Sequence, residues 1–261
     1  MTSPHSDSAA PTRRFSDRVE NYIRYRPSYP LGVVEALREH AGLGSGAVVA
    51  DVGSGTGIFA ERLLAVGARV IGLEPNDAMR AAAEQLLARK PNFTSLAGTA
   101  EATGLPAASG DLVTAAQACH WFDGPASRRE FARILRPGGL VALIWNERLT
   151  DATPFHVEYE ALLKRHATDY EQVNHANLDE TALAAFFAPA AMTVLEFPNA
   201  QAFDLAGLQG RLLSSSYAPN AGQPGHEAMM DAVNELHARH QVEGRVAFLY
   251  KTKVYLGKMS S

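Results

Sequence analysis

The sequence is poor in cysteine, has no excess of basic residues and lacks long hydrophobic runs. Cys119 is the one cysteine among 261 residues, so no disulfide forms within the chain, and a reducing, cytoplasmic environment is expected. The 24 Lys and Arg residues against 28 Asp and Glu give a net charge of −4, which argues against a nucleic-acid partner. No hydrophobic run approaches the roughly 20 residues of a membrane-spanning helix and no apolar leader is present, so no membrane partner is expected.

What the chain does contain is typical of a globular protein. Hydrophobic residues make up 46% and charged residues 20% of the sequence, proportions close to the globular average. Residues 1–14 are small and polar and include two prolines, so we predict a disordered tail there. No linker divides the remainder, and residues 15–261 are predicted to form a single domain. Within it, residues 204–242 are predicted to be a helical insertion over one face of the sheet, a candidate lid.

Between residues 47 and 145, apolar runs rich in β-branched residues alternate with segments of helical periodicity. Strands are predicted over residues 47–52, 69–74, 93–97, 111–116 and 140–145. Helices are predicted from Pro30 to Gly42, Phe59 to Gly67, Asn76 to Arg89 and Asp123 to Arg136, with Leu31 and Leu86 among the inward-facing residues, and again mainly over 154–187. Two late strands, over 192–197 and 246–256, pair antiparallel at one sheet edge. The predicted fold class is α/β, a doubly wound, mostly parallel sheet with helices on both faces and an antiparallel edge hairpin.

A glycine-rich loop, residues 53–57, follows the first predicted strand and opens a helix. Its third glycine comes one place too early for the G-x-G-x-x-G fingerprint of dinucleotide-binding proteins, and no Lys follows it as in a phosphate-binding loop. Asp51, just before the loop, would repel a pyrophosphate and favour a cationic ligand. Glu74 ends the second strand 19 residues after Gly55, where a carboxylate can accept both hydroxyls of an adenosine ribose. The alternative is a tight turn with a solvated Glu74.

Five strings carry a family resemblance: VADVGSGTG, VIGLEPNDAM, AGTAEATGLP, DLVTAAQACHWFD and ILRPGGLVALIWNE. They resemble the class I S-adenosylmethionine-dependent methyltransferases, in the small-molecule branch called methyltransferase type 11. YIRYRPSYP and HWF are similar to the subgroup that includes trans-aconitate methyltransferases. The resemblance implies a Rossmann-like methyltransferase fold of seven strands with the last one reversed, S-adenosylmethionine as cofactor, and a segment, residues 15–30, that closes over it.

The resemblance also implies a set of cofactor contacts. Asp51 lies near the ammonium, Glu74 holds the ribose, and Gln117 and Ala118 lie beneath the sulfonium. The methionine moiety and the adenine are lined by Gly53, Ser54, Gly55, Thr56, Gly57, Pro75, Met79, Thr99, Ala100 and Glu101. The family often has Asp where this chain has Thr99, so the contact with the adenine edge falls to the Ala100 backbone or to the Glu101 carboxylate.

Acceptor contacts are expected near the ends of the fourth and fifth strands and in the flanking helical segments. For His120 two interpretations stay open: a general base or hydrogen-bond partner of the acceptor, or a residue that packs and caps its loop. Arg26 either pairs with a carboxylate of the cofactor or acceptor, or lies on the surface. The other candidate substrate residues, each weighed against a core or solvated position, are Tyr22, Trp121, Asn146, Arg211 and Tyr217. No metal site is expected.

These features predict an enzyme that transfers a methyl group from S-adenosylmethionine to an oxygen, nitrogen or carbon of a small molecule, a carboxylate among the candidates. The sulfonium supplies the electrophile, so the protein has to align acceptor, methyl group and sulfur in line. Two alternatives stay open: an NAD-dependent oxidoreductase on the same strand plan, and a non-catalytic cofactor-binding protein.

Overall fold

The computed structural model describes residues 19–168, 170 and 180–259 of the chain. The predicted tail over residues 1–14, and the first part of the predicted closing segment, lie outside the described residues.

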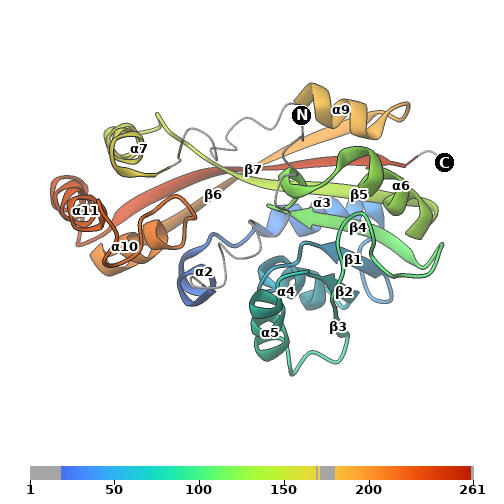
Figure 1. The fold of residues 1–261 in the computed structure, drawn as a ribbon. Coiled ribbons are helices and arrows are strands. Elements are labelled where there is room, and N and C mark those ends of the chain that lie inside the picture. The colour runs from blue at the N-terminus through green and yellow to red at the C-terminus, as the bar shows by residue number, and fades with distance from the viewer. Residues whose placement is uncertain (1–18, 169, 171–179, 260–261) are drawn as a thin grey trace, which may run out of the picture.

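The centre of the molecule is a seven-stranded sheet in the order β3-β2-β1-β4-β5-β7-β6 (Figure 1). Its strands are β1 (Val48–Val52), β2 (Arg69–Leu73), β3 (Phe93–Leu96), β4 (Gly110–Ala116), β5 (Leu135–Arg148), β6 (Met192–Phe203) and β7 (Val246–Lys258). The five strands from β3 to β5 run parallel, whereas β7 pairs antiparallel with both β5 and β6. The predicted α/β class, the strand count and the reversed last strand are confirmed.

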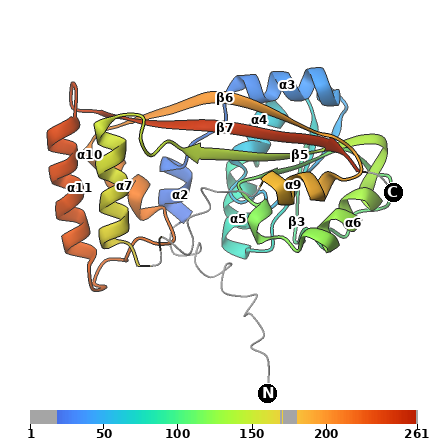
Figure 2. The ribbon, with the colours of Figure 1, turned by 90° about the horizontal axis from the view of Figure 1, so that it is seen from above.

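Helices cover both faces of the sheet (Figure 2). On one face, α3 (Leu31–Ala41) and α4 (Ile58–Ala65) enclose a core with β1, β2 and β5, while α6 (Gly124–Ile134) and α9 (Glu180–Phe187) enclose a second core on the other. α5 (Asp77–Leu86) packs beside β3 and stops earlier than predicted. The predictions for Leu31 and Leu86 were wrong: each is the end residue of its helix, where the inward-facing side is already filled by its neighbours, and both are exposed.

Four helices gather beyond the far end of β5, β6 and β7, and we call them the helical lobe: α2 (Val19–Tyr25), α7 (Pro154–His166), α10 (Leu205–Leu213) and α11 (His226–His240). β6 is longer than predicted because its second half runs into this lobe beside β7, which begins at Val246 as predicted (Figures 1 and 2). Residues 204–242, the predicted insertion, contain α10 and α11, which pack against α2, α7 and the parts of β6 and β7 that lie in the lobe.

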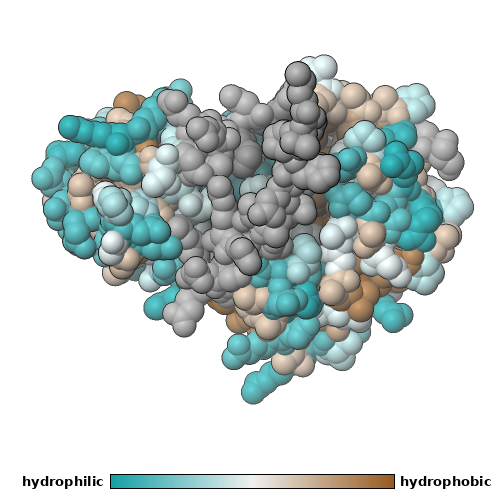
Figure 3. All heavy atoms as spheres, in the orientation of Figure 1, coloured by the Kyte–Doolittle hydropathy of each residue, from teal (hydrophilic) through white to brown (hydrophobic). Residues whose placement is uncertain are grey.

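The helical lobe has a hydrophobic core of its own, separate from the two sheet cores. Aromatic side chains dominate it, with Phe248 of β7 in edge contact with Phe155, Tyr159 and Phe203. The alternation predicted along β7 explains this, since every second residue from Val246 is buried. On the side shown in Figure 3, the outer surface of the lobe is mostly hydrophilic, as expected for helices that bury one face.

Glycine brings α2 against α10. A Cβ at position 210 would lie 2.0 Å from Cε2 of Tyr25, so only glycine allows the two helices to approach this closely. Through this contact the residues that follow α2 are held near α10 and the sheet. None of the helices within the described ranges has the length and apolarity to cross a bilayer.

Candidate active site

A cavity opens at the carboxyl ends of β1, β4 and β5. The glycine loop forms one side of it, and the segment after α2 together with the helical lobe forms the other. Open α/β sheets bind their ligands at this edge, beside the point where strand order reverses. Here that point is β1, which has β2 on one side and β4 on the other.

The glycine loop turns sharply because its glycines adopt left-handed backbone conformations. φ is +68° at Gly53, +56° at Gly55 and +84° at Gly57. A Cβ on Gly53 would lie 2.5 Å from Cβ of Ala118, so the loop and the end of β4 touch. A Cβ on Gly55 would meet only Cε of Met79, at 3.9 Å, which leaves the space above Gly55 open to a ligand. Ser54 and Thr56 line the same cavity.

Asp51 is buried at the end of β1 and lines the cavity. Its Oδ1 accepts a hydrogen bond of 2.7 Å from the hydroxyl of Thr114, whereas nothing in the described part of the chain bonds to Oδ2. Burial raises the pKa of Asp51 to about 7 and nearby Glu74 adds to the rise, while the bond from Thr114 opposes it. The site thus holds a carboxylate whose charge a cationic ligand would stabilise.

The carboxylate of Glu74 folds back over the glycine loop. Its Oε2 accepts from the Gly55 N–H at 2.9 Å and its Oε1 from the Asn76 N–H at 2.8 Å. Burial raises the pKa of Glu74, against the lowering effect of these two hydrogen bonds. A carboxylate has about four acceptor positions, so roughly two stay available for ribose hydroxyls. The same arrangement occupies the Gly55 N–H that a pyrophosphate would need.

The residues predicted to contact the adenine belong to the start of α5 and to the turn after β3, outside the residues that line the cavity. Pro75 leads into α5, where Met79 is buried. Thr99 and Ala102 exchange two backbone hydrogen bonds of 3.3 Å, which closes the turn that carries Ala100 and Glu101. Ala100 is buried in the sheet core. One oxygen of Glu101 accepts from the N–H of Asp123 at 2.9 Å, so this carboxylate ties the turn to the start of α6.

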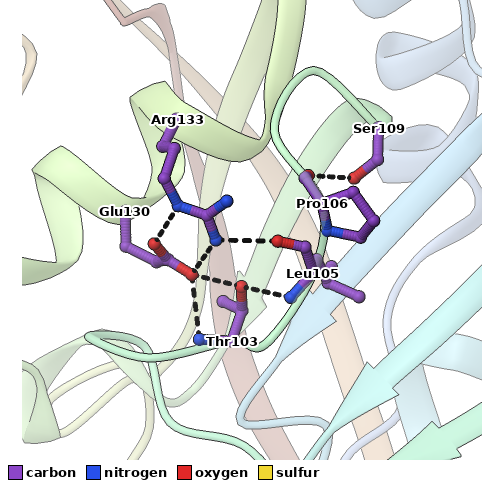
Figure 4. Close-up of polar contacts among 6 residues, drawn as sticks. All are labelled: Thr103, Leu105, Pro106, Ser109, Glu130 and Arg133. Atoms are coloured by element: carbon purple, nitrogen blue, oxygen red, sulfur yellow. Dashed lines mark hydrogen bonds and ion pairs between the residues drawn. The ribbon is translucent and has the colours of Figure 1, made fainter.

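A polar network fixes the loop that follows this turn (Figure 4). Glu130 on α6 accepts from the N–H of Thr103 at 3.0 Å and also from the Thr103 hydroxyl. Arg133 donates to both oxygens of Glu130 at 2.7 Å and to the carbonyl of Leu105 at 2.8 Å. The hydrogen bond from Arg133 lowers the pKa of Glu130 to about 2, with Thr103 contributing. The network positions the turn and makes no contact with the cavity.

Gln117 ends β4 in a left-handed conformation, with φ at +58°, which is uncommon for a residue other than glycine. Its side chain pairs with the backbone of β5: Oε1 accepts from the Asn146 N–H at 2.8 Å. Asn146 in turn accepts from Thr252 at 2.5 Å and from Asn199 at 3.1 Å. Both Gln117 and Asn146 line the cavity, so strain at the end of β4 is held by a buried amide network.

His120 and Trp121 lie outside the residues that line the cavity. They form a short 3₁₀ turn, Cys119–Trp121, in which the His120 ring packs against Trp121 and, edge-on at 5.0 Å, against Trp145. Trp121 is exposed. Burial raises the pKa of Cys119 to about 12, so this thiol carries no charge at neutral pH.

Of the remaining candidates, Tyr22, Arg26 and Arg211 line the cavity opposite the glycine loop. Nη2 of Arg26 donates to the carbonyl of Ser214 at 2.9 Å, which ties the segment after α2 to the end of α10. Tyr217 does not line the cavity; its ring packs edge-on against Tyr170 at 5.0 Å.

Two further residues line the cavity from the helical side. Tyr250 of β7 donates to Gln201 at 2.9 Å and accepts from Nε of Arg211 at 3.1 Å. Sequence analysis assigned Tyr250 only to a strand, because its nearness to Arg211 depends on how far β7 reaches beyond the sheet. Arg148, at the end of β5, pairs with Glu160 and donates to Tyr170.

Comparison with known proteins shows which proteins this chain is similar to. The model of a methyltransferase domain family matches residues 50–143. An uncharacterized methyltransferase of Mycobacterium tuberculosis is 40% identical over 134 residues, 51% of this chain and 52% of the relative. An uncharacterized methyltransferase-like protein of Schizosaccharomyces pombe is 30% identical over 158 residues, 60% of each chain. The match thus spans between half and three fifths of these relatives' own length.

A solved structure shares the architecture. The structure of a putative type II methyltransferase from Anaeromyxobacter dehalogenans superimposes with a TM-score of 0.67 at 23% identity, over 90% of this chain and 98% of that one. At this identity the likeness shows the fold. The strand order and this likeness give the chain the fold of the class I methyltransferases, and the family match shows that residues 50–143 are similar to a methyltransferase domain.

Proposed function

We propose that the whole chain is an S-adenosylmethionine-dependent methyltransferase that methylates an oxygen, nitrogen or carbon of a small molecule. The observation that carries this proposal is the pair of carboxylates at the glycine loop, the buried Asp51 with an open Oδ2 and Glu74 folded over Gly55. Such a site attracts a cationic sulfonium nucleoside with free hydroxyls and disfavours a pyrophosphate.

The residues present fit this cofactor. The space that a Cβ on Gly55 would enter is open, so the methionine moiety can approach the backbone there. Oδ2 of Asp51 would accept from the ammonium, and the unfilled acceptor positions of Glu74 would take the ribose hydroxyls. Met79 and Pro75 would flank the adenine, and Gln117 with Ala118 would lie beneath the sulfur.

Methyl transfer from this cofactor requires the protein mainly to position the two reactants. The cofactor supplies an activated methyl group, so the chain's task is to hold the acceptor in line with it. The pairing of Gln117 with Asn146 fixes the end of β4 where the two ligands meet. The segment after α2, anchored by Arg26 on Ser214, would limit water access from the helical side once the ligands are bound. A carboxylate acceptor needs no general base, whereas a protonated acceptor does.

Calorimetric titration with S-adenosylhomocysteine tests the cofactor assignment. We expect Glu74→Ala to weaken binding by about 1–3 kcal/mol, because the ribose would lose a charged hydrogen-bond partner. Glu39→Ala, an exposed glutamate on α3, is the matched control and should leave the affinity unchanged. Equal affinities for Glu74→Ala and wild type, or binding of NADH in place of S-adenosylhomocysteine, would reject the proposal.

For His120 we predict an effect on turnover rather than on cofactor binding. Its ring packs against Trp145 and Trp121, and it follows by three residues Gln117, which lines the cavity. His120→Ala should bind S-adenosylhomocysteine with wild-type affinity and methylate its acceptor more slowly. His40→Ala, at an exposed position on α3, controls for the loss of an imidazole. A wild-type rate in His120→Ala, measured with the true acceptor, would make His120 a packing residue only.

A further inference from the structure

The helical side of the cavity concentrates positive charge in a buried position. Arg26, Arg148 and Arg211 all line it, from the segment after α2, the end of β5 and α10. Each is tied to the protein by hydrogen bonds, so the three guanidinium groups are held in place rather than spread into solvent. Of these three arginines, only Arg148 has a carboxylate partner among the described residues, Glu160.

Arg211 is the most unusual of the three, because it is 6% exposed and forms no ion pair with any described residue. Neutral groups surround it: the Tyr250 hydroxyl at 3.1 Å, the Ser215 hydroxyl at 3.1 Å, and the face of the Phe248 ring at 5.4 Å from its guanidinium carbon. Charged side chains are almost never fully buried without a partner, because desolvation costs several kcal/mol per ion. A buried guanidinium of this kind is set up to receive an anion.

Two more polar groups at this end have nothing to bond to. Nη1 of Arg148 and the hydroxyl of Tyr159 are both buried without a hydrogen-bond partner in the described residues. The Arg148 guanidinium lies over the Tyr159 ring, 5.2 Å from its centroid. Buried donors are nearly always satisfied in folded proteins. Arg148 lines the cavity, so its unsatisfied Nη1 indicates a ligand there; Tyr159 does not line the cavity but is in direct contact with the Arg148 guanidinium.

The two ends of the cavity carry opposite charges, which suggests that they bind different ligands. The carboxylates of Asp51 and Glu74 belong to the glycine-loop end, and the guanidinium groups belong to the helical end. A cationic cofactor and an anionic acceptor would each find a complementary end, and each would be disfavoured at the other.

We propose that Arg211 and Arg148, with the Tyr159 hydroxyl, form a subsite for an anionic group, carboxylate or phosphate, on the methyl acceptor. This inference rests on the proposed function, because it treats the glycine-loop end as the cofactor's place. It assigns the helical lobe the role of acceptor recognition and makes Arg211 the residue that selects for charge. Tyr250 and Ser215 are positioning residues, because they orient the guanidinium of Arg211.

The test uses the full chain saturated with S-adenosylhomocysteine, so that the cofactor's own carboxylate is already in place. Succinate, inorganic phosphate and the neutral analogue succinamide are then titrated at constant ionic strength, with calorimetry and thermal denaturation as readouts. We expect succinate or phosphate to bind and raise the melting temperature, and succinamide to do neither. Binding of succinate alone would identify a carboxylate, and binding of phosphate alone a phosphoryl group.

Variants separate recognition from folding. Arg211→Gln should weaken anion binding by about tenfold or more, the size of a charged hydrogen-bond contribution, while S-adenosylhomocysteine binds as in wild type. Arg129→Gln, an exposed arginine on α6, is the matched control. Tyr159→Phe removes only a buried hydroxyl without a described partner, so it should fold at least as stably as wild type and still bind the anion several-fold more weakly.

If Arg211→Gln does not fold, Arg211→Lys and Tyr159→Phe carry the test. Lysine keeps the charge but loses the forked geometry, so Arg211→Lys should bind the anion more weakly than wild type. No anion binding by wild type, or wild-type anion affinity in Arg211→Lys and Tyr159→Phe, would overturn the subsite. Failure of wild type to bind S-adenosylhomocysteine would instead reject the proposed function, so the two failures are distinguishable.

Discussion

The α/β part of the molecule and the helical lobe differ in how their contribution to the cavity is assembled. The cofactor side comes from one stretch of chain, in which the glycine loop, Glu74 and Gln117 follow one another within 65 residues. The helical side combines α2, α7, α10 and α11 with the ends of β5, β6 and β7. The residues of the helical lobe can therefore change while the cofactor side stays the same, because changes in the lobe do not alter the glycine loop.

The two regions also differ in charge and in how that charge is held. At the glycine loop, buried carboxylates have raised pKa values, so a positive ligand gains by restoring their charge. In the lobe, Arg211 is surrounded by the hydroxyls of Tyr250 and Ser215 and the face of the Phe248 ring, without a described counter-ion. Because of this difference, a substitution or a change of pH can affect one region and leave the other unchanged.

The largest effect is expected from Gly53→Ala, which changes only the glycine loop on the cofactor side of the cavity. A left-handed alanine costs about 1–2 kcal/mol, and the overlap of its Cβ with Cβ of Ala118, 2.5 Å away, adds about 1–3 kcal/mol of overpacking. The free energy of unfolding should fall by the sum, and S-adenosylhomocysteine binding should weaken by more than tenfold because the loop shifts.

Gly104→Ala is the matched control for this substitution. Gly104 has nearly the same φ, +72°, but nothing lies within 4 Å of an added Cβ. It should therefore show only the backbone cost and keep wild-type cofactor affinity. Equal losses of stability in Gly53→Ala and Gly104→Ala, from urea denaturation, would mean that the contact with Ala118 relaxes freely.

The next effect is a pH dependence of cofactor affinity that comes from Asp51. Its pKa of about 7 without ligand lies far above the ordinary value, and a cationic ligand binds the ionised form better. As the pH falls below 7, a proton competes with the ligand, so affinity should decline by up to about tenfold per pH unit, the change that one proton can cause.

Calorimetry with S-adenosylhomocysteine between pH 5.5 and 8, on wild type and Asp51→Asn, measures this dependence. The difference between the two curves isolates Asp51 from groups that titrate on the ligand itself. Parallel curves would remove Asp51 from the ammonium site.

Positions that depend on spacing along the chain could be predicted from the sequence. The glycines of the loop and Glu74 belong to consecutive elements, and strand–helix alternation fixes where such residues meet. Arg211 and Tyr250 were harder, because they are 39 residues apart and meet only through the packing of α10 against an extended β7. Trp121, a candidate substrate residue weighed against a core or solvated position, is exposed, because its direction is set by a short turn and not by a strand or helix period.

The smallest effect concerns the stability of the helical lobe. His156, near the start of α7, accepts a hydrogen bond from the Leu249 N–H on Nε2 at 2.9 Å, and its Nδ1 lies 2.7 Å from the Thr153 hydroxyl. Accepting on Nε2 requires a neutral ring. Burial, with a contribution from Arg148, lowers the pKa of His156 in the folded state.

Because the folded pKa of His156 lies below the unfolded value of roughly 6.5, the unfolded chain takes up the proton first as the pH falls. The contribution of His156 to stability is thus complete above that pH and is lost on acidification. Urea denaturation from pH 7.5 to 5 should show wild type losing stability more steeply than His156→Gln, whereas His40→Gln should follow wild type. If acidification destabilised wild type and His156→Gln equally, the lobe would tolerate a charged His156 ring. The hydrogen bond from Leu249 to His156 would then make no pH-dependent contribution to stability.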